Sequence, residues 1–286
     1  MTTHNNSYIP RPLEHRVALV TGAGRGVGKS LAIKLAAAGA QLVVADLDAE
    51  PASETVNQIE KLGGRAVALV GDVTQESFGN TAIECMLDNF GGVDIIVNNA
   101  GYIWNTSIHK TTDEQWHEML ECHATAPFRI LRAAGEYIRK AAKKEEENGR
   151  SFHRKVVNVS SIAGFYGGAT QVAYSAGKAA QIGITKTLAK EWARYRVNVN
   201  CVGFGWIETR LTQEFVSGAP ATVEVAGKDY AVGFSAESRD TLKQIIPMGR
   251  AGTTEEAAGA VYLFCLPESD YITGETIVAG GGLLSY

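Results

Sequence analysis

Short apolar segments alternate with helical segments along almost the whole chain, and this alternation restricts the fold more than any other feature of the sequence. The apolar segments are rich in Val, Ile, Leu and Ala. They span residues 17–20, 41–45, 65–70, 93–97, 155–159, 197–202 and 276–279. Apolar strands that alternate with helices are typical of a parallel sheet covered by helices on both faces. We therefore predict an α/β fold with a doubly wound parallel sheet in a single domain, and ligands at the carboxyl ends of the strands.

Three segments depart from this alternation. Residues 1–13 are mostly polar and are expected to form an N-terminal arm before a domain that spans residues 14–286. Residues 143–149 are charged and are predicted to be a solvated insertion between a helix and a strand. Residues 211–246 are rich in Gly, Ala, Ser and Thr without a clear period, and are predicted to be a long substrate loop.

Composition and charge exclude several classes of function. The formal net charge is −4 and no basic block occurs, which argues against nucleic acid as a partner. No apolar run approaches the ~20 residues that cross a bilayer, and the N-terminal residues lack the apolar region of a secretory signal. The four cysteines are far apart in the sequence and fit small core residues in a reducing compartment. We therefore expect a cytoplasmic protein with no metal, no membrane and no nucleic-acid partner.

A glycine-rich turn follows the first apolar segment and precedes the first helical one. Its glycines have the spacing Gly-x-x-x-Gly-x-Gly. Gly22 permits a tight turn, Gly26 lets the backbone approach a pyrophosphate, and Gly28 permits close packing of helix and strand. The helix that follows directs free N–H groups and the positive end of its dipole toward phosphate. This position in the chain predicts a dinucleotide site rather than an ordinary turn.

Asp46 ends the second apolar segment, where a carboxylate can accept hydrogen bonds from the ribose hydroxyls of adenosine. The same negative charge repels a 2′-phosphate and so favours NAD over NADP. Arg25 acts in the opposite direction, because a guanidinium in the glycine loop can hold that phosphate, whereas Leu47 supplies no second base. We therefore expect NAD as the cofactor. The alternative role for Asp46 is that of a helix cap or a turn residue.

Tyr174 and Lys178 are four residues apart in a helical segment, so their side chains lie on one face, one turn from each other. Free tyrosine has a pKa of about 10, and a lysine ammonium held nearby favours the phenolate and lowers that pKa. Such a pair can move a proton to or from a substrate oxygen near pH 7. On its own this spacing also fits an ordinary surface pair. Ser161, shortly upstream, fits on its own a strand-end residue that satisfies local backbone groups.

These motifs occur in the order found in the short-chain dehydrogenase/reductase (SDR) family, and the chain resembles that family from about residue 14 to residue 282. The resemblance implies a Rossmann fold of the single-domain branch and a nicotinamide cofactor. It also implies that Ser161, Tyr174 and Lys178 are catalytic. The expected cofactor contacts are Gly22, Arg25, Gly26, Val27, Gly28, Asp46, Leu47, Asp72, Val73, Asn99, Ala100, Gly101, Tyr174, Lys178, Ile207 and Thr209. Such proteins commonly form tetramers through two long helices, expected here at about residues 113–142 and 173–194, so we expect a homo-oligomer, either a tetramer or a dimer.

The chain departs from the family pattern near the expected site. Where the family often has an asparagine that helps to hold a water in a proton relay, this chain has His123. A histidine can itself carry protons, so His123 is either a further catalytic candidate or a residue tolerated in the helix. The usual Pro-Gly after the sixth strand is replaced by Phe204-Gly205, followed by Trp206, which indicates either an altered pocket floor or core packing. The residues expected to face the substrate are Trp104, Phe165, Tyr166, Gln171 and Trp206.

The chemistry that these residues suggest is hydride transfer between a nicotinamide and a small-molecule substrate. In oxidation Tyr174 takes the proton of a substrate hydroxyl, in reduction it donates that proton, and Ser161 holds the same oxygen in line. We predict an NAD(H)-dependent oxidoreductase that interconverts a secondary alcohol and a ketone. Overall similarity to the 3-oxoacyl-(acyl-carrier-protein) reductase-like subgroup favours a 3-oxoacyl or 3-hydroxyacyl thioester. A steroid, cyclic or sugar alcohol is the alternative within this class, and a low-turnover nicotinamide-binding scaffold or sensor is the alternative from another class.

Overall fold

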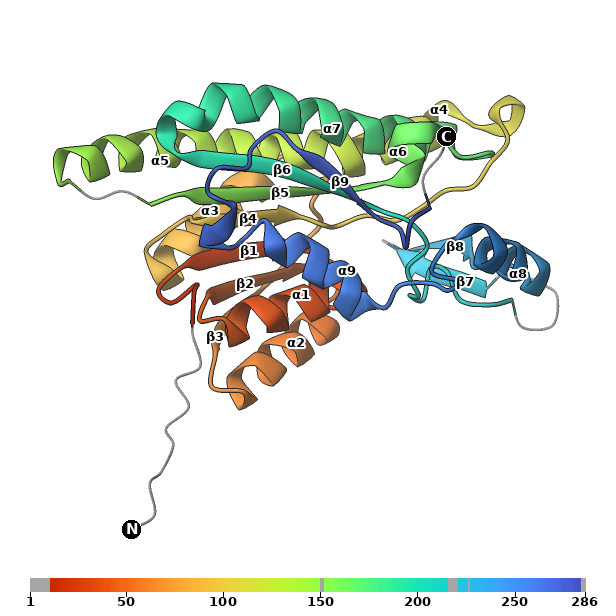
Figure 1. Cartoon of the computed structure of the whole chain (residues 1–286), viewed down its shortest axis with the longest axis horizontal. Coiled ribbons are helices and arrows are strands. Elements are labelled where there is room, and N and C mark those ends of the chain that lie inside the picture. The colour runs from red at the N-terminus through yellow and green to blue at the C-terminus, as the bar shows by residue number, and fades with distance from the viewer. Residues whose placement is uncertain (1–10, 150–151, 216–220, 226, 284–286) are drawn as a thin grey trace, which may run out of the picture.

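A seven-stranded parallel sheet forms the centre of the molecule (Figure 1). The structure is a computed structural model that describes residues 11–149, 152–215, 221–225 and 227–283. The strands lie in the order β3-β2-β1-β4-β5-β6-β9. Their bounds are β1 (Val17–Thr21), β2 (Gln41–Asp46), β3 (Arg65–Val70), β4 (Ile95–Asn98), β5 (Arg154–Ser161), β6 (Val197–Phe204) and β9 (Thr276–Ala279). The predicted doubly wound sheet is confirmed, and each predicted apolar segment contributes a strand.

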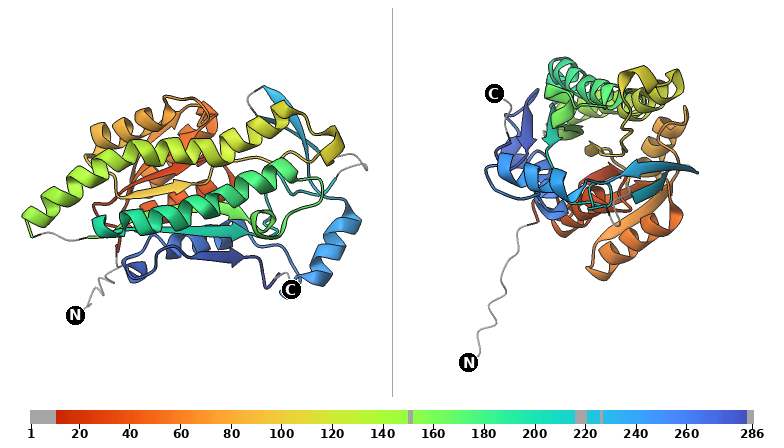
Figure 2. Two further views of the ribbon diagram at one scale, coloured as in Figure 1. Left: turned by 90° about the horizontal axis from the view of Figure 1, so that it is seen from above. Right: turned by 90° about the vertical axis from the view of Figure 1, so that its right-hand side faces the viewer.

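Helices cover both faces of this sheet, as the views in Figure 2 show. Helices α1, α2 and α9 pack on one face, and α3, α5 and α7 pack on the other. The helices are α1 (Gly26–Ala37), α2 (Ala49–Lys61), α3 (Phe78–Phe90), α4 (Asp113–Leu120), α5 (Ala126–Glu147), α6 (Ile162–Tyr166), α7 (Val172–Trp192), α8 (Ala236–Ile245) and α9 (Thr254–Leu263). Among the described residues, every helix is too short or too polar to span a lipid bilayer.

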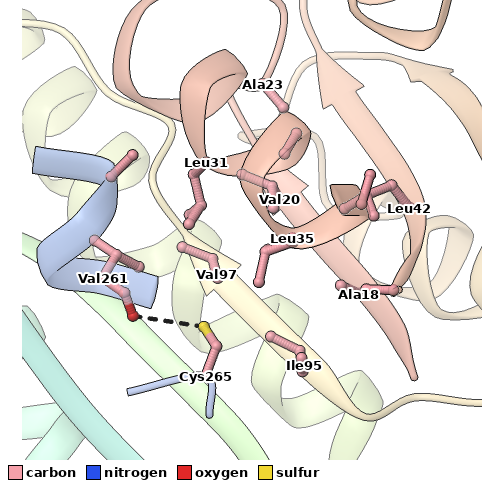
Figure 3. Packing of buried hydrophobic residues seen from close by; sticks show 14 of the residues in the cluster. Ala18, Val20, Ala23, Leu31, Leu35, Leu42, Ile95, Val97, Val261 and Cys265 are labelled. Atoms are coloured by element: carbon pink, nitrogen blue, oxygen red, sulfur yellow. Dashed lines mark hydrogen bonds between the residues drawn. The ribbon is translucent and has the colours of Figure 1, made fainter. Parts of the chain in front are cut away.

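The core forms two layers because successive side chains of a strand point to opposite faces of the sheet. Ala18 and Val20 of β1 pack with α1 and α9, whereas Val17 and Leu19 pack with α3, α5 and α7. Figure 3 shows the first layer, in which Val261 of α9 faces the same apolar cluster as the residues of α1. All five residues of β1 are buried, which explains why this strand is a continuous apolar run in the sequence.

The direction of chain winding reverses at β1, which has β2 on one side and β4 on the other. Connections from the two neighbouring strands therefore leave in opposite directions, and a crevice opens at the carboxyl ends of the strands. The hydroxyl of Thr21, the last residue of β1, joins the two sides of this point. It donates to the Val97 carbonyl (3.4 Å) and accepts from the N–H groups of Asn99 (3.1 Å) and Ala100 (3.0 Å).

The predicted loop at residues 211–246 is instead largely ordered secondary structure, although part of it lies outside the described residues. Strands β7 (Ala221–Val225) and β8 (Lys228–Val232) form an antiparallel hairpin, and α8 follows. Val223, Tyr230 and Val232 are buried in a small cluster of their own, separate from the two main layers. The hairpin lies beyond the carboxyl ends of the strands of the main sheet (Figure 1).

The charged run at residues 143–149 is mostly exposed, as predicted, but it is helical, because α5 continues through it to Glu147. Glu145 accepts two hydrogen bonds, of 3.0 and 2.5 Å, from the guanidinium of Arg154, whose side chain is only 2% exposed. This ion pair ties the last turns of α5 to the start of β5, which explains why the run stays helical.

The expected N-terminal arm lies mostly outside the described residues, since residues 1–10 are not among them. Leu13, at the end of the expected arm, is 2% exposed and donates its N–H to the Ala38 carbonyl at 2.9 Å. The packed domain therefore begins slightly earlier than predicted.

Candidate active site

A cavity of about 1000 Å³ lies at the carboxyl ends of the strands, at the point where the winding reverses. All sixteen expected cofactor contacts line it, together with Ser161 and His123. Residues from the glycine loop, the ends of β2, β4, β5 and β6, and helix α7 thus meet in one space. This position is the one at which doubly wound sheets bind dinucleotides.

Gly22 and Gly28 occupy positions in the glycine loop that leave no room for a side chain. Gly22 has a φ of 63°, and a Cβ placed on it would lie 2.9 Å from the Cα of Ala100. A Cβ on Gly28 would lie 2.1 Å from the carbonyl oxygen of Gly22, an atom of the backbone. No side chain caps the first turn of α1, and that turn holds no acidic residue. The cradle therefore fits the phosphates of a dinucleotide, whose charge would satisfy the free N–H groups.

Asp46 faces the glycine loop and is held by backbone groups. One carboxylate oxygen accepts from the N–H of Gly24 at 2.7 Å, and the other accepts from the N–H of Asp48 at 3.1 Å. Each oxygen keeps a further lone pair for a ribose hydroxyl. The turn role that the sequence left open is thus present, and it leaves room for cofactor binding. Arg25 forms an ion pair with Asp48, so its charge is already matched.

The ammonium of Lys178 donates to a backbone carbonyl rather than to the phenol oxygen of Tyr174. Its side chain is 4% exposed, and Nζ donates to the Val159 carbonyl at 2.8 Å and lies 5.8 Å from the ring centroid of Tyr174. Burial raises the pKa of Tyr174 to about 12, while the Ser161 hydroxyl acts in the opposite direction. Burial also lowers the pKa of Lys178 to about 8. The expected lowering of the tyrosine pKa by Lys178 is therefore not found, because burial outweighs the opposing hydrogen bond from Ser161.

Ser161 is the last residue of β5 and the N-cap of α6, and this half-buried residue lines the cavity. The hydroxyl oxygen accepts from the N–H of Ala163 at 3.2 Å, which caps the short helix. A hydroxyl that accepts one bond can still donate its own hydrogen. The strand-end role and a role toward a substrate oxygen are thus compatible at this residue.

His123 lies on a single π-helical turn (Glu121–Thr125) between α4 and α5, and this turn places its side chain inside the protein. The ring is 0% exposed, and Nε2 lies 2.8 Å from the carbonyl oxygen of Tyr102. A carbonyl only accepts, so Nε2 carries the hydrogen and Nδ1 keeps its lone pair. Nδ1 is buried without a partner among the described residues. Burial and the charge of Lys178 lower the pKa of His123 well below 6.5, so the ring is neutral.

The His123 ring and the Lys178 ammonium both lie close to Gly101. A Cβ placed on Gly101 would lie 2.9 Å from Nδ1 and 3.6 Å from Nζ. The imidazole also meets the ring of Tyr174 edge to face, with centroids 5.1 Å apart. The histidine therefore contacts the tyrosine and lies close to the lysine of the candidate site.

The residues expected to face the substrate divide into two groups. Gln171 lines the cavity, where its amide donates to Asn105 Oδ1 at 3.0 Å. Trp104, Phe165, Tyr166 and Trp206 are not part of the lining. Trp104 packs on Tyr230, Phe165 packs against Gly203, Tyr166 is 52% exposed, and Trp206 lies between Arg239 and Phe234. For Trp206, core packing is the alternative that the structure favours.

The hairpin supplies cavity residues that the sequence analysis missed. Lys228 and Tyr230 of β8 line the cavity, and Lys228 pairs with Glu114 at 2.9 Å and with Glu118. The ring of Tyr230 lies 4.8 Å from that of Tyr102, the residue that holds His123. The available signal was the alternation of polar and apolar residues at 222–225 shortly before Gly227, which is typical of a hairpin strand.

Comparison with known proteins gives consistent matches over the full domain. The family model described as short chain dehydrogenase matches residues 16–219. The chain is 35% identical over 271 residues to the 3-oxoacyl-(acyl-carrier-protein) reductase of Vibrio cholerae, covering 95% of this chain and 98% of that protein. It is 30% identical to the 2-dehydro-3-deoxy-D-gluconate 5-dehydrogenase of Dickeya dadantii, covering 96% and 97%. The crystal structure of a short-chain type dehydrogenase/reductase from Mycobacterium marinum matches with a TM-score of 0.81 at 27% identity, covering 96% and 98%.

Proposed function

The chain belongs to the short-chain dehydrogenase family and is therefore an oxidoreductase, and from this premise we propose that it reduces a 3-oxoacyl thioester with NADH or catalyses the reverse oxidation. The observation that carries the proposal is the single cavity that joins the glycine loop and Asp46 to Ser161, Tyr174 and Lys178. A bound nicotinamide supplies or accepts the hydride. The support for the thioester is the similarity to the Vibrio cholerae reductase.

The protein residues manage the proton and the substrate oxygen. Tyr174 donates its phenolic proton to the substrate oxygen in reduction and removes a proton from it in oxidation. Because burial raises the pKa of Tyr174 to about 12, the phenol is protonated at neutral pH and carries the proton that it donates in reduction. Ser161 donates a hydrogen bond to the same oxygen, which positions it and stabilises the charge that develops there.

Lys178 and His123 also take part in this proton transfer. In this proposal the buried Lys178 ammonium binds the nicotinamide ribose and returns a proton toward Tyr174. His123 offers a neutral Nδ1 lone pair beside the lysine, where the family often has an asparagine. We propose that His123 replaces that asparagine in the proton route to the lysine.

Asp46 supports a choice of cofactor, exposed apolar side chains support an assembly, and the cysteines support a compartment. Asp46 at the end of β2 supports NAD rather than NADP, because its charge repels a 2′-phosphate. The exposed apolar side chains of Phe128 on α5 and Val172 on α7, 49% and 37% exposed, support a homo-oligomer, a tetramer or a dimer, through these helices. The four cysteines are free, which supports a reducing compartment such as the cytoplasm.

A second candidate substrate is a keto sugar acid, which is favoured by the similarity to the Dickeya dadantii dehydrogenase. A substrate panel separates the two. The loss of reduced-nicotinamide absorbance is followed with NADH and with NADPH, using an acetoacetyl thioester, a keto sugar acid and a simple cyclic ketone. We expect the highest kcat/KM for the thioester with NADH. Turnover of the sugar acid alone would support the second candidate, and binding of NADH with no turnover of any ketone would support a scaffold or sensor.

A further inference from the structure

Tyr230 of β8 packs its ring on the segment that follows β4. The residue is 5% exposed. Its ring centroid lies 4.8 Å from that of Tyr102 and 5.0 Å from that of Trp104, and both pairs meet edge to face. This is a geometry that aromatic rings favour, because the positive edge of one ring meets the negative face of the other. Tyr230 therefore restrains two neighbouring parts of the segment that leads from β4 to α4.

Contacts with α4 hold the hairpin in the same position. Lys228 pairs with Glu114 at 2.9 Å and with one carboxylate oxygen of Glu118. The hydroxyl of Tyr230 donates to the other oxygen of Glu118 at 3.4 Å. The side chains of Glu114 and Lys228 are 71% and 47% exposed, so these ion pairs contribute little. The buried ring contacts of Tyr230 are therefore the main link between the hairpin and the segment after β4.

The other end of this link is His123. The backbone carbonyl of Tyr102 lies 2.8 Å from His123 Nε2 and is the one hydrogen-bond partner of the imidazole among the residues that the structure describes. The base of the side chain is fixed by α7, because a Cβ on Gly177 would lie 2.8 Å from the Cβ of His123. The Tyr102 carbonyl fixes the outer end of the ring, and Tyr230 packs on the residue that carries this carbonyl.

We infer that Tyr230 is a positioning residue, which holds Tyr102 in place and thereby fixes the tautomer and the orientation of the His123 ring. If Tyr102 shifted, the Nε2 hydrogen would lose its acceptor, and either ring nitrogen could then carry the hydrogen. The Nδ1 lone pair would no longer be fixed in place. The effect on turnover rests on the proposed function, in which His123 takes part in the proton route. The hairpin thus has a second role besides lining the cavity.

¹⁵N NMR of the histidine rings, in the chain without cofactor or substrate, tests the positioning. The shifts of the two ring nitrogens show which of them carries the hydrogen, and the loss of signals in His123→Leu assigns those of His123. The variants are Tyr230→Ala, the conservative Tyr230→Phe and the control Val232→Ala, which removes a side chain that is equally buried in the hairpin but does not line the cavity. We expect one tautomer in the unsubstituted chain, in Tyr230→Phe and in Val232→Ala, and a mixture of both in Tyr230→Ala.

Turnover of the best ketone of the substrate panel with NADH tests the consequence for the reaction. We expect Tyr230→Ala to lower kcat about 10- to 100-fold with NADH affinity unchanged, and Tyr230→Phe to recover most of this loss. In a chain that already carries His123→Leu, the same Tyr230→Ala change should alter kcat little, because both residues act on one step. Thermal melting checks that each variant is folded, and Tyr230→Leu, which keeps more of the buried volume, takes the place of an unfolded Tyr230→Ala.

Three results would overturn the inference. The first is a single His123 tautomer in Tyr230→Ala, and the second is the same mixture in Tyr230→Ala and in Val232→Ala, because general loosening of the hairpin would then be the cause. The third is an equal fall in kcat with and without the His123 side chain, because Tyr230 would then act on the substrate directly. If the unsubstituted chain reduces no ketone, the proposed function fails, and the NMR result still decides whether Tyr230 positions His123.

Discussion

Replacing Asp46 separates its structural role from its role in cofactor choice. In Asp46→Ala the N–H of Gly24, a buried residue, loses its 2.7 Å acceptor. A buried donor left without a partner destabilises a fold by about 1–3 kcal/mol, so we expect a loss of this size in the free energy of unfolding. In Asp46→Asn the amide oxygen can still accept that hydrogen bond, so we expect a smaller loss.

Both Asp46 variants remove the same negative charge, so both should change the preference between NADH and NADPH. Two unit charges ~4 Å apart repel by about 1 kcal/mol in bulk water, and by more where water is partly excluded. We therefore expect the ratio of the two dissociation constants to move toward NADPH by at least about fivefold. The ratio is measured by fluorescence titration, and stability by urea denaturation. An unchanged ratio in Asp46→Asn would show that this carboxylate does not select the cofactor.

Three further changes test other parts of the structure. Gly28→Ala would place a Cβ 2.1 Å from the carbonyl oxygen of Gly22, so we expect stability to fall by about 1–3 kcal/mol and cofactor binding to be lost in titrations. His123→Asn should reduce acid sensitivity in denaturation measured from pH 7 to pH 5. Because the pKa of His123 is lowered well below 6.5, the unfolded chain binds a proton below about pH 6.5 that the folded chain does not, so stability present above that pH is lost as the pH falls. Glu145→Gln should lower stability by about 3 kcal/mol, because Arg154 is left buried with a weaker partner.

Matched controls accompany these three changes. Gly259→Ala on α9 adds a Cβ with no atom within 4 Å, and Glu147→Gln removes an exposed charge near the end of α5. His117→Asn removes an exposed histidine from α4. A change that has the same effect as its control would show that the feature it removes is not the cause of the effect. These features are the tight contact at Gly28, the buried imidazole of His123 and the buried ion pair of Glu145.

The sequence predicted the parts of the molecule whose pattern is local. The strands of the sheet are continuous apolar runs because both faces are covered, and the glycine loop lies between the first strand and the first helix. The expected cofactor residues all meet at the cavity, because they are placed by strand ends and by the helical spacing of Tyr174 and Lys178.

The parts that were missed depend on contacts between distant segments. The hairpin at β7 and β8 buries only a small cluster, so its sequence is more polar than that of the main strands. Trp206, for which the sequence left a pocket floor and core packing open, is 6% exposed, and its ring packs against Arg239, a contact between separate segments. Burial also raises the pKa of Tyr174, and the spacing of residues in the sequence does not reveal burial.

Turnover by the Tyr174→Phe variant tests the central claim most directly. Phenylalanine keeps the ring that packs edge to face on His123 and removes only the oxygen that carries the proton. With the best ketone of the substrate panel and NADH, the account predicts a fall in kcat of about 10²–10⁴-fold with little change in NADH affinity. Turnover equal to that of the unsubstituted chain would contradict the account, because the proton would then come from another group.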